Sequence, residues 1–118
     1  MTRQTALGLG LAAVAAALAT LPSWARADVQ PRTVRVEATE YAFALTPKSV
    51  RHGTVVFEVV NAGARAHDFR IAGKRTPVLA PGETARLTLT LDHPGVYAYF
   101  CTVAGHAVAG MKGSLRVR

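Results

Sequence analysis

The residues with the most distinctive chemistry lie in one short segment near the C-terminus, YFCTVAGHAVAGMKG, which runs from Tyr99 to Gly113. It contains the only cysteine of the chain, Cys101, then His106 five positions later and Met111 five positions after that. A thiolate, an imidazole and a thioether are soft donors that together select copper, whereas calcium prefers oxygen ligands. The segment therefore predicts a copper site that needs one further ligand.

The fourth ligand must come from the three other histidines of the chain, His52, His67 and His93. His67 precedes an alternating segment that ends at Ile71, so it stands near the start of a strand and can face the C-terminal segment. His52 and His93 lie beside a glycine or a proline and are interpreted as solvated turn residues. Two imidazoles and a thiolate in a plane, with a long axial thioether, form the blue-copper electron-transfer arrangement.

The elements that must position these residues are predicted to be strands. Apolar and polar residues alternate in five stretches, and in each stretch the apolar residues would share one face of a strand. The apolar residues of the five stretches are Val34 and Val36; Phe43 and Leu45; Val55, Phe57 and Val59; Ala85, Leu87, Leu89 and Leu91; and Leu115 and Val117. Turn residues rich in glycine and proline separate these stretches, and no helix of useful length is expected after residue 28. The pattern predicts an all-β sandwich of about seven or eight strands.

The aromatic residues before the cysteine connect this scaffold to the chemistry. Tyr97 and Tyr99 share a face with Cys101 at the end of one strand, and Gly113 begins the next. The copper segment is therefore expected to be the loop between the last two strands. Loops held on a rigid sandwich commonly carry function.

The N-terminus has the three regions of an export signal. Arg3 is followed by an apolar, alanine-rich run from Ala6 to Leu21, and Ala25 and Ala27 then form a small-x-small cleavage pattern. The apolar run falls short of the about 20 residues that a membrane-spanning helix needs. We therefore expect cleavage after Ala27, with a membrane attachment only if the segment is retained.

Residues 1–27 are thus interpreted as a signal peptide, and residues 28–118 as one periplasmic domain. The chain has 14 lysine and arginine residues against seven acidic ones, but the basic residues are scattered and only Lys74 and Arg75 are adjacent. This distribution argues against nucleic-acid binding and favours the approach of an acidic partner. We expect the domain to be a monomer.

The loop Cys101-x4-His106-x4-Met111, preceded by PGVYAYFC and followed by GMKGSLRV, resembles the copper loop of the cupredoxins, the small blue copper proteins of the plastocyanin/azurin type. Its spacing is similar to that of the longer loops of the rusticyanin and auracyanin branch. The resemblance covers essentially all of residues 28–118 and implies a Greek-key β-sandwich. It also implies one type 1 copper ion, whose ligands would be His67, Cys101, His106 and Met111.

The family resemblance further implies a one-electron carrier that works outside the cytoplasm with a redox partner, such as a c-type cytochrome or an exported oxidoreductase. One residue departs from the pattern, because many relatives have an asparagine after the first histidine and this chain has Asp68. In those relatives the asparagine ties the two ligand segments together near the residue after the cysteine, here Thr102. A carboxylate can still accept a hydrogen bond from Thr102, and its charge should favour Cu(II).

Other interpretations of the same residues are less consistent with the pattern. A buried thiol and a core methionine are each common, but Met111 is the only methionine after the initiator and lies beside Gly110 in a loop. Zinc fits less well because methionine is not among its usual ligands. A thiol hydrolase using Cys101 and His106 would need an orienting third residue and an oxyanion hole.

With all four positions filled by protein ligands, we expect a carrier and not an enzyme. The residues around His106 are small or apolar, and Val108 in particular is expected to contribute to a partner-docking patch. The alternative function is copper buffering, delivery or tolerance in the periplasm. The absence of a His-rich or Met-rich tract argues for a fixed redox site instead.

Overall fold

The structure is a computed structural model that describes residues 20–25 and 31–118. The chain divides into two units, residues 1–30 and residues 31–118. In the first unit residues 23–25 form one helical turn, and most of the predicted signal peptide, with Ala27, lies outside the described residues. No helix in the described part of the chain is long and apolar enough to cross a membrane.

The second unit is a β-sandwich, as predicted, and contains nine strands in two sheets. One sheet has the order β2-β1-β4-β7 and consists of β1 (Arg32–Thr39), β2 (Ala42–Thr46), β4 (Gly53–Asn61) and β7 (Thr84–Leu91). The other has the order β3-β9-β8-β5-β6 and consists of β3 (Ser49–Val50), β5 (Arg70–Ile71), β6 (Lys74–Arg75), β8 (Gly95–Phe100) and β9 (Lys112–Val117). β1 pairs in parallel with β4, and β3 with β9, whereas the other pairs are antiparallel. The strands exceed the expected seven or eight because β3, β5 and β6 have two residues each, too few to show alternation.

The core follows the alternation of the sequence. In the register of β1 and β4, Val34 lies opposite Phe57 and Val36 opposite Val59, and all four side chains are buried. Each such side chain contributes about 1.5–3 kcal/mol through the apolar surface that it removes from water. The charged neighbours of these residues point outward, which fixes the register of the sheet.

Phe69 lies at the centre of an aromatic cluster between the two sheets. Its ring centroid lies 5.3 Å from that of Phe43, 5.4 Å from that of Phe57 and 5.4 Å from that of Tyr99. Phe69 is two residues after His67, and Tyr99 is two residues before Cys101. The aromatic cluster therefore anchors both predicted ligand segments to the core.

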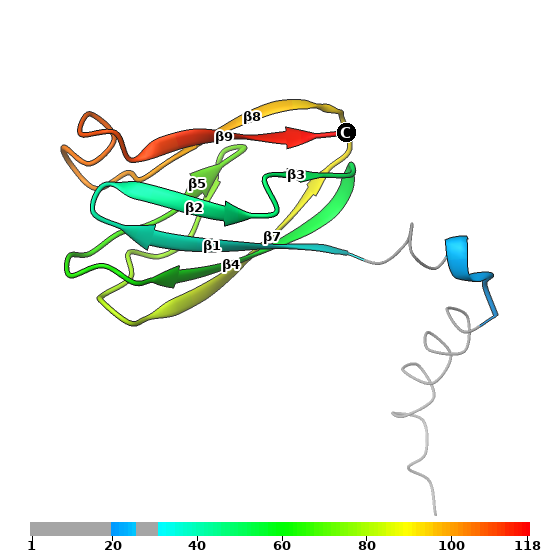
Figure 1. The fold of residues 1–118 in the computed structure, drawn as a ribbon, viewed down its shortest axis with the longest axis horizontal. Helices are drawn as coiled ribbons and strands as arrows, with labels where there is room; N and C mark the ends of the chain where they lie inside the picture. The colour runs from blue at the N-terminus through cyan, green and yellow to red at the C-terminus, as the bar shows by residue number, and fades with distance from the viewer. Residues whose placement is uncertain (1–19, 26–30) are drawn as a thin grey trace, which may run out of the picture. The chain divides into compact units, whose positions relative to one another are not determined.

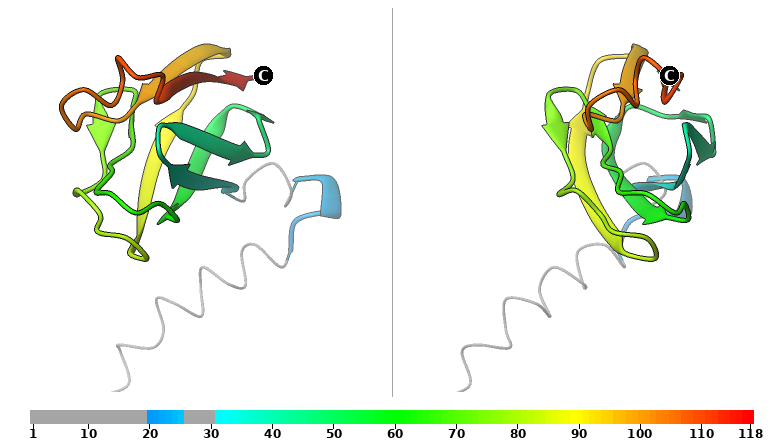
Figure 2. Two further views of the ribbon diagram at one scale, coloured as in Figure 1. Left: turned by 60° about the vertical axis from the view of Figure 1, so that its left-hand side comes forward. Right: turned by 90° about the vertical axis from the view of Figure 1, so that its left-hand side faces the viewer.

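The predicted ligand segments meet at one end of the sandwich. Figure 1 shows the β8–β9 loop, drawn in orange, at the same end as the β1–β2 turn and the segment that follows β4, with the C-terminus at the other end. The right-hand view of Figure 2 looks onto this end. Three connections that are far apart in the sequence thus surround one region.

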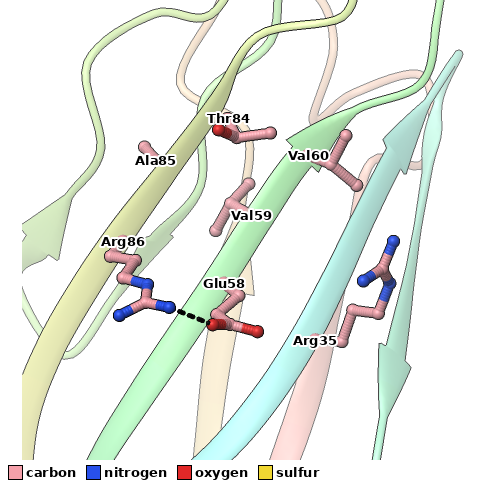
Figure 3. Close-up of a pocket in the computed structure, with 7 residues that line it drawn as sticks. All are labelled: Arg35, Glu58, Val59, Val60, Thr84, Ala85 and Arg86. Atoms are coloured by element: carbon pink, nitrogen blue, oxygen red, sulfur yellow. Dashed lines mark hydrogen bonds and ion pairs between the residues drawn. The ribbon is translucent and has the colours of Figure 1, made fainter.

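The outer face of the four-stranded sheet carries a row of charged side chains. Arg35, Glu58 and Arg86 lie side by side on β1, β4 and β7, and Arg86 Nη2 donates to Glu58 Oε2 over 2.7 Å (Figure 3). An exposed ion pair of this kind contributes at most about 1 kcal/mol to stability. A shallow pocket lies along this row, and its lining includes none of the predicted copper ligands.

Candidate metal centre

Three of the four predicted ligands bring their donor atoms together. One donor atom each of His67, Cys101 and His106 lies within 4.8 Å of the other two, and all three side chains are buried. The Nδ1 atoms of the two imidazoles are 3.2 Å apart, and Cys101 Sγ is 3.5 Å from His106 Nδ1. These separations are those of neighbouring ligands on one ion when metal–nitrogen and metal–sulfur bonds measure about 2.0 and 2.3 Å.

Met111 lies beside this group. Its side chain is fully buried and packs in a small apolar cluster with Cys101 and Ala38. A thioether beside a thiolate and two imidazoles completes the donor set that suits copper and not zinc. That these four residues bind the ion remains a prediction from their placement and chemistry.

The β8–β9 loop orders three of the candidate ligands through its own backbone. The N–H of Cys101 donates to the carbonyl oxygen of Met111 over 3.1 Å, and the N–H of Met111 donates to that of His106 over 3.0 Å. Gly105 and Gly110 immediately precede His106 and Met111 and have φ angles of +83° and +113°. Glycine adopts such angles without the steric cost that other residues incur, so each one fixes the approach of the following ligand.

The segment that carries His67 is held by a different set of bonds. The N–H of His67 donates to the carbonyl oxygen of Leu79 over 3.1 Å, and the N–H of Leu79 donates to that of His67 over 2.7 Å. The side-chain Nδ2 of Asn61 donates to the carbonyl oxygens of Leu79 and Arg65, both over 2.8 Å. His67 lies just before β5, as predicted, but the role of Asn61 was not apparent from the sequence, where it looked like an ordinary turn residue.

Asp68 joins the two ligand segments. Its Oδ1 accepts from the backbone N–H of Thr102 over 2.6 Å, and its Oδ2 accepts from the Thr102 hydroxyl. Asp68 is buried, so the carboxylate belongs to the interior of the site. The expectation that Asp68 can replace an asparagine as the acceptor for Thr102 is confirmed.

Glu40 is a second carboxylate at the site, and sequence reasoning missed it. It directly follows β1, and its Oε1 lies 3.3 Å from His67 Nε2. The same oxygen accepts from the backbone N–H groups of Ala64 and Arg65 over 2.8 and 2.7 Å. Partial burial would raise the pKa of Glu40, but the N–H groups of Arg65 and Ala64, with His67, lower it below its usual value.

Comparison with known proteins identifies the family. Residues 25–118 match the family described as copper binding proteins of the plastocyanin/azurin family. The chain belongs to this family of cupredoxins. A segment of 42 residues is 48% identical to auracyanin-B of Chloroflexus aurantiacus and covers 36% of this chain but 18% of auracyanin-B.

Solved structures of other cupredoxin folds agree with this assignment. Auracyanin A, described as a "blue" copper protein from Chloroflexus aurantiacus, is 26% identical, with a TM-score of 0.66 over 75% of this chain and 100% of its own. A copper nitrite reductase from Nitrosomonas europaea is 24% identical, with a TM-score of 0.59 over 75% of this chain and 41% of the reductase chain. The likeness to the reductase shows the fold alone.

The cupredoxin cofactor is copper, and the buried donor set fits one type 1 ion. Burial raises the pKa of Cys101, the N–H groups of Asp68 and Val103 lower it in part, and the charge of the Asp68 carboxylate raises it again. The net shift is upward, so without metal the side chain is a thiol at neutral pH. Binding of a metal as thiolate must therefore displace a proton.

The remaining histidines and the apolar loop residues also have definite places in this cupredoxin. His52 and His93 are exposed, and His52 Nδ1 lies 2.8 Å from the carbonyl oxygen of Arg118, in agreement with their interpretation as turn residues. Val108 is 93% exposed, whereas Val103 packs against the cluster of Cys101 and Met111. Val108 therefore lies on the surface, whereas Val103 is partly buried.

Proposed function

We propose that this chain is an exported type 1 copper protein that carries single electrons between redox partners. The observation that carries the proposal is the buried cluster of His67, Cys101 and His106 with Met111 packed against the cysteine. A copper ion held by these four residues would supply the reversible exchange of one electron between its Cu(II) and Cu(I) states. The residues of the chain supply a fixed, largely dry set of donors.

The placement of the donors favours a carrier over an enzyme. The three donor side chains are at most 9% exposed, and Met111 is fully buried beside them. A substrate would have to displace one of these protein ligands to reach the ion, whereas a catalytic metal site keeps an open position. Electron exchange needs no such opening.

His106 is the proposed route for the electron. It is the most exposed of the four candidate ligands, and the ring of Tyr41 meets it edge-on with centroids 5.0 Å apart. The exposed Val108 lies two residues further along the same loop. A partner that contacts this end of the sandwich would reach the imidazole through a small, short-lived interface.

The partner and the location are parts of the same proposal. The excess of basic residues would speed the approach of an acidic redox protein, such as a c-type cytochrome or an exported oxidoreductase. The export signal predicted for residues 1–27 supports an exchange in the periplasm, and we propose that the domain acts there as a monomer. Scattered basic residues give no support for a nucleic-acid partner.

The test is to add Cu(II) to the purified, metal-free protein and to record its visible absorption and EPR spectra. We expect an intense thiolate-to-copper band that Cys101→Ser abolishes and that His93→Ala, a surface histidine control, leaves unchanged. Voltammetry should then show a reversible one-electron wave with the copper retained. A colourless copper complex would overturn the blue-copper assignment, and release of copper on each reduction would favour copper delivery instead.

A further inference from the structure

The β1–β2 turn places a carboxylate behind one of the candidate ligands. Glu40 Oε1 lies 3.3 Å from Nε2 of His67, whereas the other ring nitrogen, Nδ1, lies 3.2 Å from Nδ1 of His106. The side chain of Glu40 is 28% exposed, whereas that of His67 is 1% exposed. The carboxylate thus reaches a buried ring from the edge of the site.

The loop after β4 is folded around this carboxylate. Oε1 of Glu40 accepts from the N–H groups of Ala64 and Arg65, and a Cβ atom on Gly63 would lie 2.7 Å from both carboxylate oxygens. Asn61 accepts from the N–H of Gly63 over 2.9 Å and so fixes the same turn. Glu40 is therefore held in place by neighbours and is not a freely rotating surface side chain.

The hydrogen bond between Glu40 Oε1 and His67 Nε2 determines which nitrogen of His67 carries the proton. A neutral imidazole has one N–H and one free lone pair, and only the nitrogen with the lone pair can bind a metal ion. Because an ionised carboxylate can only accept, it selects the form of His67 that is protonated at Nε2. That form leaves Nδ1 of His67 free toward Cys101 and His106.

We propose that Glu40 is a positioning residue of the copper site, which fixes the ring orientation and tautomer of His67 and adds negative charge that favours Cu(II). This inference rests on the proposed function, because it concerns the same ion. Metal-bound histidines generally donate their second N–H to an oxygen acceptor, and the loss of that acceptor weakens metal binding by about 10–100-fold. Here the acceptor is an ionised side chain, which a substitution can remove or neutralise.

Two variants of Glu40 separate its charge from its hydrogen bond. Glu40→Ala removes both, so we expect the Cu(II) affinity, measured by competition with a chelator, to fall by about 10–100-fold. Glu40→Gln keeps an oxygen that can accept from His67, so the blue band should persist. The loss of charge should nevertheless weaken Cu(II) binding more than Cu(I) binding and raise the reduction potential.

The matched control is Glu83→Gln. Glu83 Oε1 accepts from the backbone N–H of Ala80 over 2.6 Å, so it ties a loop as Glu40 does. Among the described residues its side chain makes no hydrogen bond to His67, Cys101 or His106. This variant should keep the wild-type affinity and potential. In the Cu(I) protein, NMR should show a slowly exchanging Nε2 proton on His67 in the wild type and in Glu40→Gln but not in Glu40→Ala.

The outcomes distinguish this inference from the proposed function. If both Glu40 variants match Glu83→Gln in Cu(II) affinity and in potential, Glu40 only orders the loop and its positioning role is overturned. If the wild-type protein itself forms no blue copper complex, the proposed function fails and the role of Glu40 fails with it. A shift of the potential in Glu40→Gln with an intact blue band supports the role, because a purely structural tie would leave the potential unchanged.

Discussion

Asn61 offers a stringent test of how the His67 segment is held. Its side chain is fully buried at the end of β4 and makes three hydrogen bonds, to the carbonyl oxygens of Arg65 and Leu79 and from the N–H of Gly63, over 2.8 to 2.9 Å. At about 0.5–1.5 kcal/mol for each bond, Asn61→Ala should lower the free energy of unfolding by about 2–4 kcal/mol. For a domain of this size, the loss should reduce Tm by roughly 10–30 °C.

Asn61→Asp tests the two bonds from Nδ2 to carbonyl oxygens specifically, because it preserves the shape of the side chain. One carboxylate oxygen can still accept from Gly63, but the other would face the carbonyl oxygens of Arg65 and Leu79. The folded state would therefore raise the pKa of the new carboxyl group above its unfolded value of about 3.9. Stability relative to the wild type should then be lost as pH rises from that unfolded value through the higher folded value, so the deficit is larger at pH 7 than at pH 4.

Thermal unfolding of the metal-free proteins, followed by circular dichroism at both pH values, measures these differences. Thr54→Ala is a suitable control because Thr54 is exposed near the other end of β4. Its Tm should stay within a few degrees of that of the wild type. An Asn61→Asp variant as stable as the wild type at pH 7 would show that the bonds to the two carbonyl oxygens do not hold the segment.

Two further predictions concern the charge and the surface of the site. Asp68→Asn should raise the reduction potential, because it removes a buried charge that favours Cu(II) and keeps an acceptor for Thr102; an unchanged or lower potential in voltammetry would contradict this. Val108→Glu should slow electron self-exchange between the Cu(I) and Cu(II) proteins several-fold and leave the copper spectrum intact, because like charges would meet where two copies touch. Val96→Glu alters an equally apolar, exposed residue at the far end of β8, and NMR line broadening should detect no such slowing for it.

The sequence predicted the features that depend on local pattern. Val34 and Phe57 belong to runs with a period of two, so their inward direction could be inferred without knowledge of their partners. Cys101, His106 and Met111 were recognisable because their types and spacing are unusual within one loop. The location of His67 just before a strand followed from the same kind of local reasoning.

The contacts that the sequence did not reveal join residues from separate connections. Glu40 meets His67 only because the β1–β2 turn and the segment after β4 lie at the same end of the sandwich. Asn61 in a turn sequence gives no sign that its side chain will point inward and bond to Leu79. Such contacts depend on the register of β1 with β4 and on loop packing, which no short window of residues encodes.

The β8–β9 loop also affects how proteins with this fold can diversify. β8 and β9 stay paired up to Phe100 and Lys112, so residues 101–111 leave and re-enter the sheet at two fixed neighbouring points. Evolution, or a protein engineer, can therefore lengthen, shorten or replace this loop while the segment between β4 and β5, which carries His67 and Asp68, stays in place. One stable scaffold can in this way host a series of metal sites whose properties differ through a single exchangeable stretch of chain.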